Sequence, residues 1–468
     1  MLEFLGGDSV ENVTCEYLTA GDVSDSHHRQ PQSVGLLPGF WENGWDISRS
    51  LWDHNSLVIH LDIEYVNFDF PVEPYLEPER IFDLQRPVEL VIEAVLLDYG
   101  IVPLHLLSGR GHHFVWRIRQ NSRAFRRLAK LGRVPPTLER LNAQSHRPNG
   151  KSISPKLGQA FAGLGLVMEY LAHRIKEEAA PLCGIPVELT AVEVGPNQHG
   201  REMISIDISE YGDPLSTRVI RVPFSLYLKP LQQRNVLGEQ IVNRLPPVFL
   251  IPLHEMDSQQ GVRVMHDINQ VSDLARRATV KIPDQTQSTE GLISSYQKSS
   301  LKEFHDRFYS QEHEPVEKWT ATYDRTSFDP LPNCTRYILE HPNDLLLRPG
   351  NLERVVRVML SLGWHPRHIA GLIRSKFQRD YGWGDRWNGY DPATRADFYT
   401  RVFAGLFVTR VDDLVDFNCQ SAKEEKLCFI NNCPFNLEQY RKSLLDRRKY
   451  ERLARWPFHR LFLPEEHL

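Results

Sequence analysis

The sequence predicts an α+β protein in which a sheet-containing first half is followed by an all-α C-terminal part. Apolar runs rich in leucine and β-branched residues, which are typical of buried strands, occur at Leu57–Tyr65, Val102–Leu107 and Met203–Ile208. Beyond Leu331 the apolar residues recur at helical spacing instead, and no strand pattern of any length appears. The chain has 468 residues, which is enough for two or three domains.

The composition is that of an ordinary soluble protein. Apolar residues make up 41% and charged residues 25% of the chain, and the net charge of −5 does not by itself indicate a nucleic-acid-binding protein. No apolar run of about 18 residues predicts a membrane span, and the first ten residues lack the pattern of a signal peptide. We therefore expect a cytoplasmic protein without a membrane partner. Six cysteines in a chain of this length do not predict a disulfide scaffold.

Two carboxylates, Asp62 and Glu64, lie in the first predicted strand with one residue between them. Because side chains on a strand alternate between its faces, both acids point the same way and repel each other unless a positive charge lies between them. Two divalent cations about 4 Å apart, bridged by carboxylates, can clamp the attacking and leaving oxygens of a phosphoryl transfer. Oxygen ligands favour Mg²⁺ or Mn²⁺. The alternative is an ordinary solvated strand end, because the Asp-x-Glu pattern is common.

A glycine turn with phosphate-binding side chains follows the helix predicted at Val88–Tyr99 and the second predicted strand. Its two glycines let backbone N–H groups approach an anion closely. Ser108, Arg110 and His113 add donors suited to phosphate. The chain then resumes as a strand at Phe114–Ile118, so the segment predicts a β-hairpin with a phosphate-binding tip. The alternative is a simple hairpin turn whose histidine is structural.

A third acid and a basic segment follow two helices predicted at Arg123–Leu131 and Gln159–Lys176. Asp207 is embedded in the apolar strand Met203–Ile208, and an acid in such a run needs a partner, for which a shared metal would serve. Asp213, in a Gly-Asp-Pro turn, is a rival for this role. Further on, polar side chains interleave with apolar residues, as in a half-buried segment that points cations at a triphosphate. These side chains are Arg218, Arg221, Ser225 and Lys229. The alternatives are an aspartate at a strand edge facing water and an edge strand with a solvated basic face.

These stretches, together and in this order, resemble the archaeo-eukaryotic primase superfamily. The family's signature is a hydrophobic run with D-x-D/E, then an S-G-x-G-x-H-like turn, then a hydrophobic residue followed by aspartate. The matching stretches here are Ile59–Glu64, Ser108–His113 and Ile206–Asp207. The segment Arg218–Lys229 is similar to the R-L-I-R-x-P-x-S-L-H-x-K pattern of archaeal small subunits, with Tyr227 in place of the histidine.

The resemblance implies an RRM-like catalytic core that transfers nucleotides with two metal ions. Asp62, Glu64 and Asp207 would hold Mg²⁺ or Mn²⁺. His113, which the spacing favours over His112, would contact the phosphates of the incoming nucleotide. The nucleotide-binding set that the resemblance implies is Ser108, Arg110, His113, Arg218, Arg221, Ser225 and Lys229.

The last third of the chain contains a group of cysteines, namely Cys334, Cys419, Cys428 and Cys433. Thiolates brought together from distant points on helices are compatible with an iron–sulfur cluster or with zinc, and the alternative is cysteines buried as small hydrophobic residues. Helices are predicted to begin at Cys334 and to span Asn351–Leu362 and Pro366–Phe377. The segments Leu331–Cys334 and Asn432–Phe435 resemble the C-terminal domain of the primase large subunit, which implies a [4Fe–4S] site that helps to engage template and initiating nucleotide.

The predicted organisation is a single-chain fusion. A primase-polymerase catalytic domain at residues 1–250 is joined by a linker at 251–325, rich in Gln, Ser and Thr at 284–300, to a helical, cysteine-containing domain at 326–468. The expected function is that of a DNA primase or primase-polymerase, a nucleotidyltransferase that uses nucleoside triphosphates on a single-stranded DNA template, with a helicase or another replication protein as a further partner. The alternatives are a non-catalytic nucleic-acid-binding replication factor on the same scaffold and a repair polymerase that extends chains without starting them.

Overall fold

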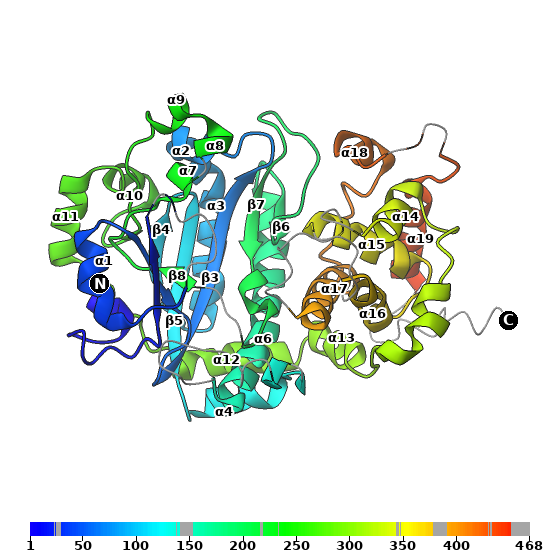
Figure 1. Ribbon diagram of the computed structural model, residues 1–468, viewed down its shortest axis with the longest axis horizontal. Coiled ribbons are helices and arrows are strands. Elements are labelled where there is room, and N and C mark those ends of the chain that lie inside the picture. Colours follow the sequence, from blue (N-terminus) through cyan, green and yellow to red (C-terminus); the bar gives the residue numbers. More distant parts are fainter. Residues whose placement is uncertain are drawn as a thin grey trace. The chain divides into compact units, whose positions relative to one another are not determined.

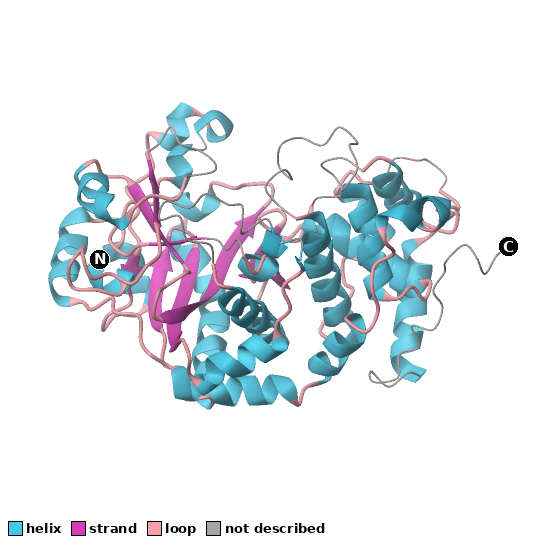
Figure 2. Cartoon of the chain, turned by 60° about the horizontal axis from the view of Figure 1, so that its bottom comes forward, coloured by secondary structure: helices cyan, strands magenta, loops and turns pink. Residues whose placement is uncertain are grey.

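The computed structural model divides the chain into two compact units. It describes residues 1–22, 24, 30–136, 138–140, 153–215, 219–232, 234–342, 346, 348–377, 391–428, 430 and 433–450. Unit 1 comprises Met1–Leu189 and Glu202–Ser294, and unit 2 comprises Thr190–Arg201 and Ser295–Leu468. The protein is mixed α+β, and its described strands, drawn in magenta in Figure 2, all belong to unit 1. Within the described residues, no helix has the length and apolar content needed to cross a membrane.

A six-stranded sheet forms the centre of unit 1 (Figure 1). Its strand order is β6-β7-β3-β5-β4-β9, and neighbours pair antiparallel except β6 and β7, which are parallel. The strand bounds are β3 (Ser56–Asn67), β4 (Leu104–Ser108), β5 (Gly111–Arg119), β6 (Val187–Leu189), β7 (Glu202–Asp207) and β9 (Ile251–Pro252). A second, three-stranded sheet contains, in spatial order, β1 (Leu18–Gly21), β2 (Asp46–Ser50) and β8 (Val219–Arg221).

Two long helices, α3 (Pro78–Asp98) and α6 (Pro155–Ala179), and the shorter α4 (Arg123–Leu131) accompany the large sheet. The ring of Phe82 in α3 lies 5.1 Å, centre to centre, from the ring of His112 in β5, so α3 covers the face of the sheet that carries His112. Helix α6 packs against α3 and α4. The other α-helices of this part are α1 (Leu37–Glu42), α2 (Glu73–Leu76), α7 (Lys229–Gln232), α8 (Arg234–Leu237), α9 (Glu239–Val242), α10 (Ser258–Val264), α11 (Ile268–Arg277) and α12 (Thr286–Gln297). Its 3₁₀ helices are η1 (Leu2–Leu5), η2 (Val34–Leu36), η3 (Ala180–Leu182) and η4 (Ser209–Gly212).

The two faces of the large sheet differ in chemistry because the central strand β3 alternates polar and apolar side chains. We call the face that carries Asp62 and Glu64 the front face and the face that carries Ile63 and Tyr65 the back face. Ile63 and Tyr65 are almost completely buried beneath the helices. On the opposite face, the side chains of Asp62 and Glu64 are 16% and 19% exposed, so a ligand can reach them.

Unit 2 is helical, and its described residues contain no strand, in agreement with the sequence prediction. Its helices are α13 (Ser300–Phe308), η5 (Val316–Ala321), η6 (Tyr323–Arg325), α14 (Asn333–Glu340), α15 (Pro349–Ser361), α16 (Pro366–Phe377), α17 (Pro392–Val408), α18 (Cys419–Glu424) and α19 (Leu437–Tyr450).

The structure differs from the predicted linker at residues 251–325. Strand β9 and helices α10 to α13 lie in this range, and unit 1 extends to Ser294 instead of ending near residue 250. Helix α12 forms in the Gln-, Ser- and Thr-rich stretch because Leu292, Ile293 and Tyr296 share one side of the helix and are completely buried. Polar composition suggested an exposed segment, but three well-spaced apolar residues are enough to fix a short helix on a core.

Candidate functional site

A row of polar side chains crosses three strands on the front face of the large sheet. Asp62 of β3 lies directly opposite His113 of β5 on one side and Asp207 of β7 on the other. Directly opposed residues of paired strands point to the same face. The register therefore places Asp62 and Asp207 side by side, with Glu64 two residues further along β3 on the same face. We call Asp62, Glu64 and Asp207 the acid row.

Several buried polar atoms in and around the acid row have no hydrogen-bond partner. Within the described residues these atoms are Asp62 Oδ1, His60 Nε2, His113 Nδ1 and Glu210 Oε1. Possible ligand atoms of His60, Asp62 and His113 all lie within 4.8 Å of one another. Burial, and then the negative charge of Glu64, raises the pKa of Asp62 well above its usual range. A divalent cation would supply partners for these atoms and stabilise the ionised acids, so the residues fit a metal site.

The turn that follows β7 holds the Asp207 carboxylate by hydrogen bonds and places Glu210 beside His60. The Asp207 carboxylate accepts hydrogen bonds from the N–H of Ser209 at 2.9 Å and from its hydroxyl at 2.6 Å. Glu210, the next residue in η4, places Oε2 2.7 Å from Nδ1 of His60, and both side chains are at most 5% exposed. Although burial opposes the charged form, the negative charge of Glu210 raises the pKa of His60. His60 is thereby held in one orientation on the front face.

Glu64 is neutralised by a cation from the turn between β4 and β5. Its carboxylate pairs with the guanidinium of Arg110. Burial opposes ionisation, but the positive charges of Arg110 and then Lys229 lower the pKa of Glu64 to about 2. Glu64 is therefore ionised throughout the physiological range, and a metal that shared this carboxylate would lie beside Arg110.

A cationic cluster, defined as Arg110, Arg221 and Lys229, adjoins the acid row. Arg221 ends β8 and donates hydrogen bonds to both carboxylate oxygens of Asp46, at 2.7 and 2.9 Å. Burial, and then the positive charge of Arg110, lowers the pKa of Lys229 to about 8, while Glu64 opposes this effect and Arg221 adds to it. The structure thus brings cations from two sheets together at one end of the acids.

Two serines that the sequence assigned to phosphate binding are engaged with the backbone. The hydroxyl of Ser108 donates to the carbonyl of Gly111 at 3.2 Å, and that of Ser225 donates to the carbonyl of Val222 at 2.7 Å. Ser108 and Ser225 are 2% and 3% exposed. Both hydroxyls serve turn geometry here, so their contact with a nucleotide stays a prediction.

Close packing explains the glycines of the turn between β4 and β5. A Cβ atom at Gly111 would collide with the carbonyl oxygen of Ile63, and one at Gly109 would lie 2.7 Å from the ring of Tyr227. The sequence interpretation, in which the glycines expose N–H groups to an anion, differs from this finding. Tyr227 fills the space above the turn.

The structure separates the rival residues of the sequence analysis. His113 lies in line with Asp207 on the front face, whereas His112, one residue earlier in β5, points to the back face. Asp213 lies beyond η4, outside the strand register that aligns the acids. The predicted nucleotide ligand Arg218 lies outside the described residues.

The cysteines of unit 2 gather around the start of α14. Cys334 is the second residue of α14, Cys419 is the first of α18, and Cys428 and Cys433 lie between α18 and α19. Burial raises the pKa of Cys334, the charge of Arg354 and a hydrogen bond from Thr335 oppose this shift, and the proximity of Cys419 and Cys428 adds to it. The Asn333 side-chain amide donates to Cys433 Sγ at 3.3 Å.

These cysteines have the properties that a thiolate-bound group requires. None of them forms a disulfide, and the N–H of Leu437 donates to Cys419 Sγ at 3.3 Å. Hydrogen bonds to sulfur are one of the means by which proteins tune iron–sulfur centres. Among the described residues, no three of these sulfur atoms lie within 4.8 Å of one another, so the four cysteines supply the donor chemistry of an iron–sulfur cluster or zinc without a preformed zinc geometry.

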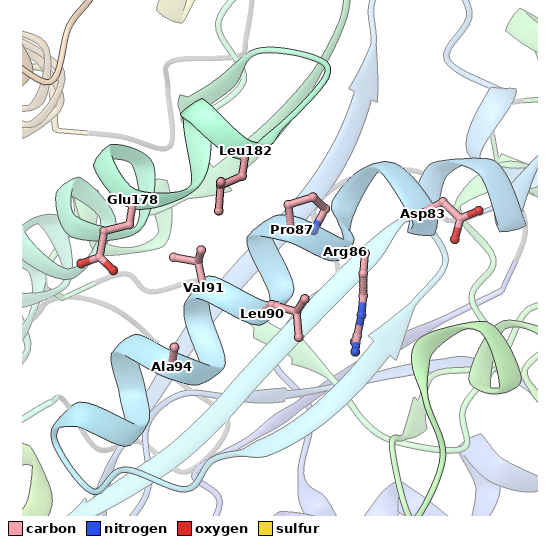
Figure 3. Close-up of a pocket in the computed structure, with 8 residues that line it drawn as sticks. All are labelled: Asp83, Arg86, Pro87, Leu90, Val91, Ala94, Glu178 and Leu182. Carbon is pink, nitrogen blue, oxygen red and sulfur yellow. The ribbon is translucent and has the colours of Figure 1, made fainter.

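A hollow of about 570 Å³ lies elsewhere in unit 1, along α3 (Figure 3). Its lining residues are Asp83, Arg86, Pro87, Leu90, Val91, Ala94, Glu178 and Leu182. It contains no residue of the acid row or the cationic cluster, so we do not include it in the candidate site.

Comparisons of the chain with protein-family models, with curated proteins and with solved structures found no match.

The sequence analysis missed two residues of the site, His60 and Glu210. His60 could have been predicted from the sequence, because it precedes Asp62 by two residues in a strand and must lie on the same face. Glu210 had none, since its approach to His60 depends on the pairing of β3 with β7 and on the turn after β7.

Proposed function

We propose that the protein is a DNA primase or primase-polymerase that joins nucleotides on a single-stranded DNA template. One observation carries this proposal: the acid row adjoins the cationic cluster. Carboxylates suited to divalent cations, next to cations suited to a triphosphate, are what two-metal nucleotidyl transfer requires.

The topology of unit 1 supports the same proposal. The elements β3, α3, β4, β5, α6 and β7 occur in this β-α-β-β-α-β order, with the shorter α2, α4, η3 and β6 between some of them, and their strands lie in the order β7-β3-β5-β4. This arrangement agrees with the RRM-like core that the resemblance implies. Because one fold hosts many functions, the argument still depends on the site.

The chain's own residues would divide the chemistry between them. Asp62, Glu64 and Asp207 would hold Mg²⁺ or Mn²⁺, which when bound activate a 3′-hydroxyl and neutralise the departing pyrophosphate. The forked guanidinium of Arg110 would bind phosphate oxygens and Lys229 would add a point charge. Their partial burial strengthens these interactions, because water screens them less.

Primer-free synthesis on single-stranded DNA tests the proposal. Purified wild-type protein is given Mg²⁺ or Mn²⁺ with ribonucleotides or deoxyribonucleotides in turn. We expect labelled chains from the wild type and none from the Asp62→Asn/Glu64→Gln variant, whose fold is checked by circular dichroism. The matched control is Asp98→Asn/Glu178→Gln, which removes two exposed acids that pair with Arg174 in the same unit and should leave synthesis unchanged.

Other results would point to the alternatives. Synthesis only from a supplied primer would indicate an extending polymerase. Binding of nucleic acid with no incorporation under any condition would indicate a non-catalytic replication factor and would contradict the proposal. Incorporation that survives the double substitution would also contradict it.

We further propose that the cysteines of unit 2 hold an iron–sulfur cluster, with zinc as the alternative. Bound there, the cluster would tie the start of α14 to the segment between α18 and α19. Protein purified without oxygen should absorb visible light near roughly 400 nm if it holds iron and sulfide, whereas zinc is colourless. Cys334→Ser should remove this absorbance, and Cys183→Ser, outside the cluster, should not.

A further inference from the structure

A second group of possible metal ligands lies on the back face of the sheet. Glu89 comes from α3, His105 from β4 and His112 from β5, and one possible ligand atom of each lies within 4.8 Å of the others. His112 precedes His113 in β5, so the two side chains point to opposite faces and this group is separate from the acid row.

Two atoms of the group are buried without a partner. Glu89 is 2% exposed and His112 is completely buried. Glu89 Oε2 and His112 Nε2 have no hydrogen-bond partner among the described residues. Nδ1 of His112 lies 2.9 Å from Nε2 of His105. These two nitrogens face each other and are the ones that would ligate an ion, so the unpartnered atom that such an ion would satisfy is Oε2 of Glu89.

The surrounding side chains orient these ligands in the way that metal sites require. Ser258 donates a hydrogen bond to Glu89 Oε1 at 2.6 Å, and Arg86 reaches the same oxygen at 2.8 Å, which leaves Oε2 available. Glu93 Oε1 lies 3.6 Å from Nδ1 of His105, which leaves Nε2 directed toward His112. A carboxylate behind a ligating histidine is the usual outer partner of a bound metal ion.

We propose that Glu89, His105 and His112 form a binding site for one zinc ion. Two imidazoles with one carboxylate form a donor set that zinc uses, whereas Mg²⁺ and Ca²⁺ prefer oxygen alone. Tetrahedral zinc holds two ligating nitrogens about 3.3 Å apart, close to the 2.9 Å between the two rings. The ion ties β4 and β5 to α3, and so steadies the hairpin whose turn carries Arg110.

Aromatic rings enclose the site on the side of the sheet. The ring of Phe114 stacks on His105 at a centroid distance of 4.1 Å, and the ring of Phe82 meets His112 edge-on. His105, with 11% of its side chain exposed, and the half-exposed Glu93 give the ion a way in from solvent. This inference does not depend on the proposed function.

Zinc counting tests the proposal on the full chain. Protein stripped with a chelator is dialysed against Zn²⁺, and bound zinc is measured by elemental analysis. Because the acid row and the cysteines can also take up zinc, the readout is a difference. Glu89→Gln/His105→Gln should bind one zinc fewer per chain than the wild type. The matched control Glu16→Gln/His54→Gln makes the same two changes at a glutamate and a histidine 3.1 Å apart elsewhere in unit 1 and should bind as many zinc ions as the wild type.

Two further measurements keep the test decisive. Glu93→Gln should weaken zinc binding at this site by about tenfold without changing the count at saturation. If the double variant does not fold, crystals of the zinc-loaded wild type should show an anomalous peak, recorded at the zinc absorption edge, in contact with Glu89, His105 and His112. A folded double variant with the full zinc count, or wild-type crystals without this peak, would overturn the proposal.

Discussion

The front and back faces of strands β3 and β5 carry different chemistry, although both faces belong to the same two strands. Successive residues of each strand send their side chains to opposite faces. On the front face, Asp62, Glu64 and Asp207 present three carboxylates, and His60 and His113 add two imidazoles beside Asp62. On the back face, β5 presents His112 opposite an apolar stretch of β3, and nitrogen atoms dominate. Strand alternation thus places two candidate metal sites on opposite faces of one sheet, and the front-face site has two more carboxylates nearby than the back-face site. The comparison predicts that front-face substitutions cost activity and back-face substitutions cost stability.

The largest expected effect is on activity, at Asp207 of the acid row. Asp207→Asn should lower nucleotide incorporation by about 10³-fold, which corresponds to about 4 kcal/mol in the barrier, because one metal ligand is lost. The free energy of unfolding should stay the same or rise, since the opposed carboxylates of Asp62 and Asp207 repel each other in the metal-free protein. Single-turnover incorporation and urea unfolding measure the two quantities.

The control for this prediction is the rival acid Asp213. Its carboxylate accepts the N–H of Leu215 at 2.9 Å beyond η4, so Asp213→Asn should change incorporation by less than about threefold. Equal losses at Asp207 and Asp213 would show that the strand register does not define the site.

A smaller effect, this time on stability, is expected on the back face at Arg80. Its guanidinium lies 2.7 Å from Glu202 and 2.8 Å from Glu73, and the side chain of Glu202 is 1% exposed. Arg80→Ala should therefore lower the free energy of unfolding by about 3 kcal/mol, because it leaves a buried carboxylate unpaired. Urea unfolding measures this change, and incorporation at low temperature should remain close to that of the wild type.

An exposed ion pair gives the matched comparison. Arg276 pairs with Asp273 at 2.7 Å, and both side chains are more than 70% exposed. Arg276→Ala should change the free energy of unfolding by less than about 1 kcal/mol. If Arg80→Ala were no more harmful than Arg276→Ala, the back face would not be the stabilising one.

The smallest expected effect is the pH dependence of nucleotide use. Lys229 has a pKa lowered to about 8, so its side chain is positive below that pH and neutral above it. If it binds the triphosphate, kcat/KM for the nucleotide should fall by about threefold to tenfold as the pH rises from 7 to 9. Lys229→Arg, which stays charged, should flatten this profile, while zinc content on the back face should not differ between the two proteins. An unchanged profile in Lys229→Arg would contradict the role.

The sequence predicts local features of this protein well because they depend on spacing within one element. The alternation in Leu57–Tyr65 places Asp62 and Glu64 on one face, and β3 has that strand. The helices at Arg123–Leu131 and Pro366–Phe377 form at the predicted residues. Such patterns depend only on neighbours three or four positions away, or two in a strand.

Features that depend on pairing between distant elements escaped prediction. Glu210 meets His60 only through the pairing of β3 with β7. Glu89, His105 and His112 meet through three different elements, although a glutamate on the buried side of an apolar helix was a visible anomaly. Helix α12 was not predicted, because its polar residues outnumber the apolar residues that it buries.

The position of β3 has a consequence for motion. It is hydrogen-bonded along both sides, to β5 and β7, so its amides should be among the slowest in the chain to exchange with deuterium. Arg221 and Lys229 belong to a different, three-stranded sheet and to the four-residue helix α7. Any adjustment around a bound substrate would therefore move Arg221 and Lys229 relative to the acids, which are held on the central strand.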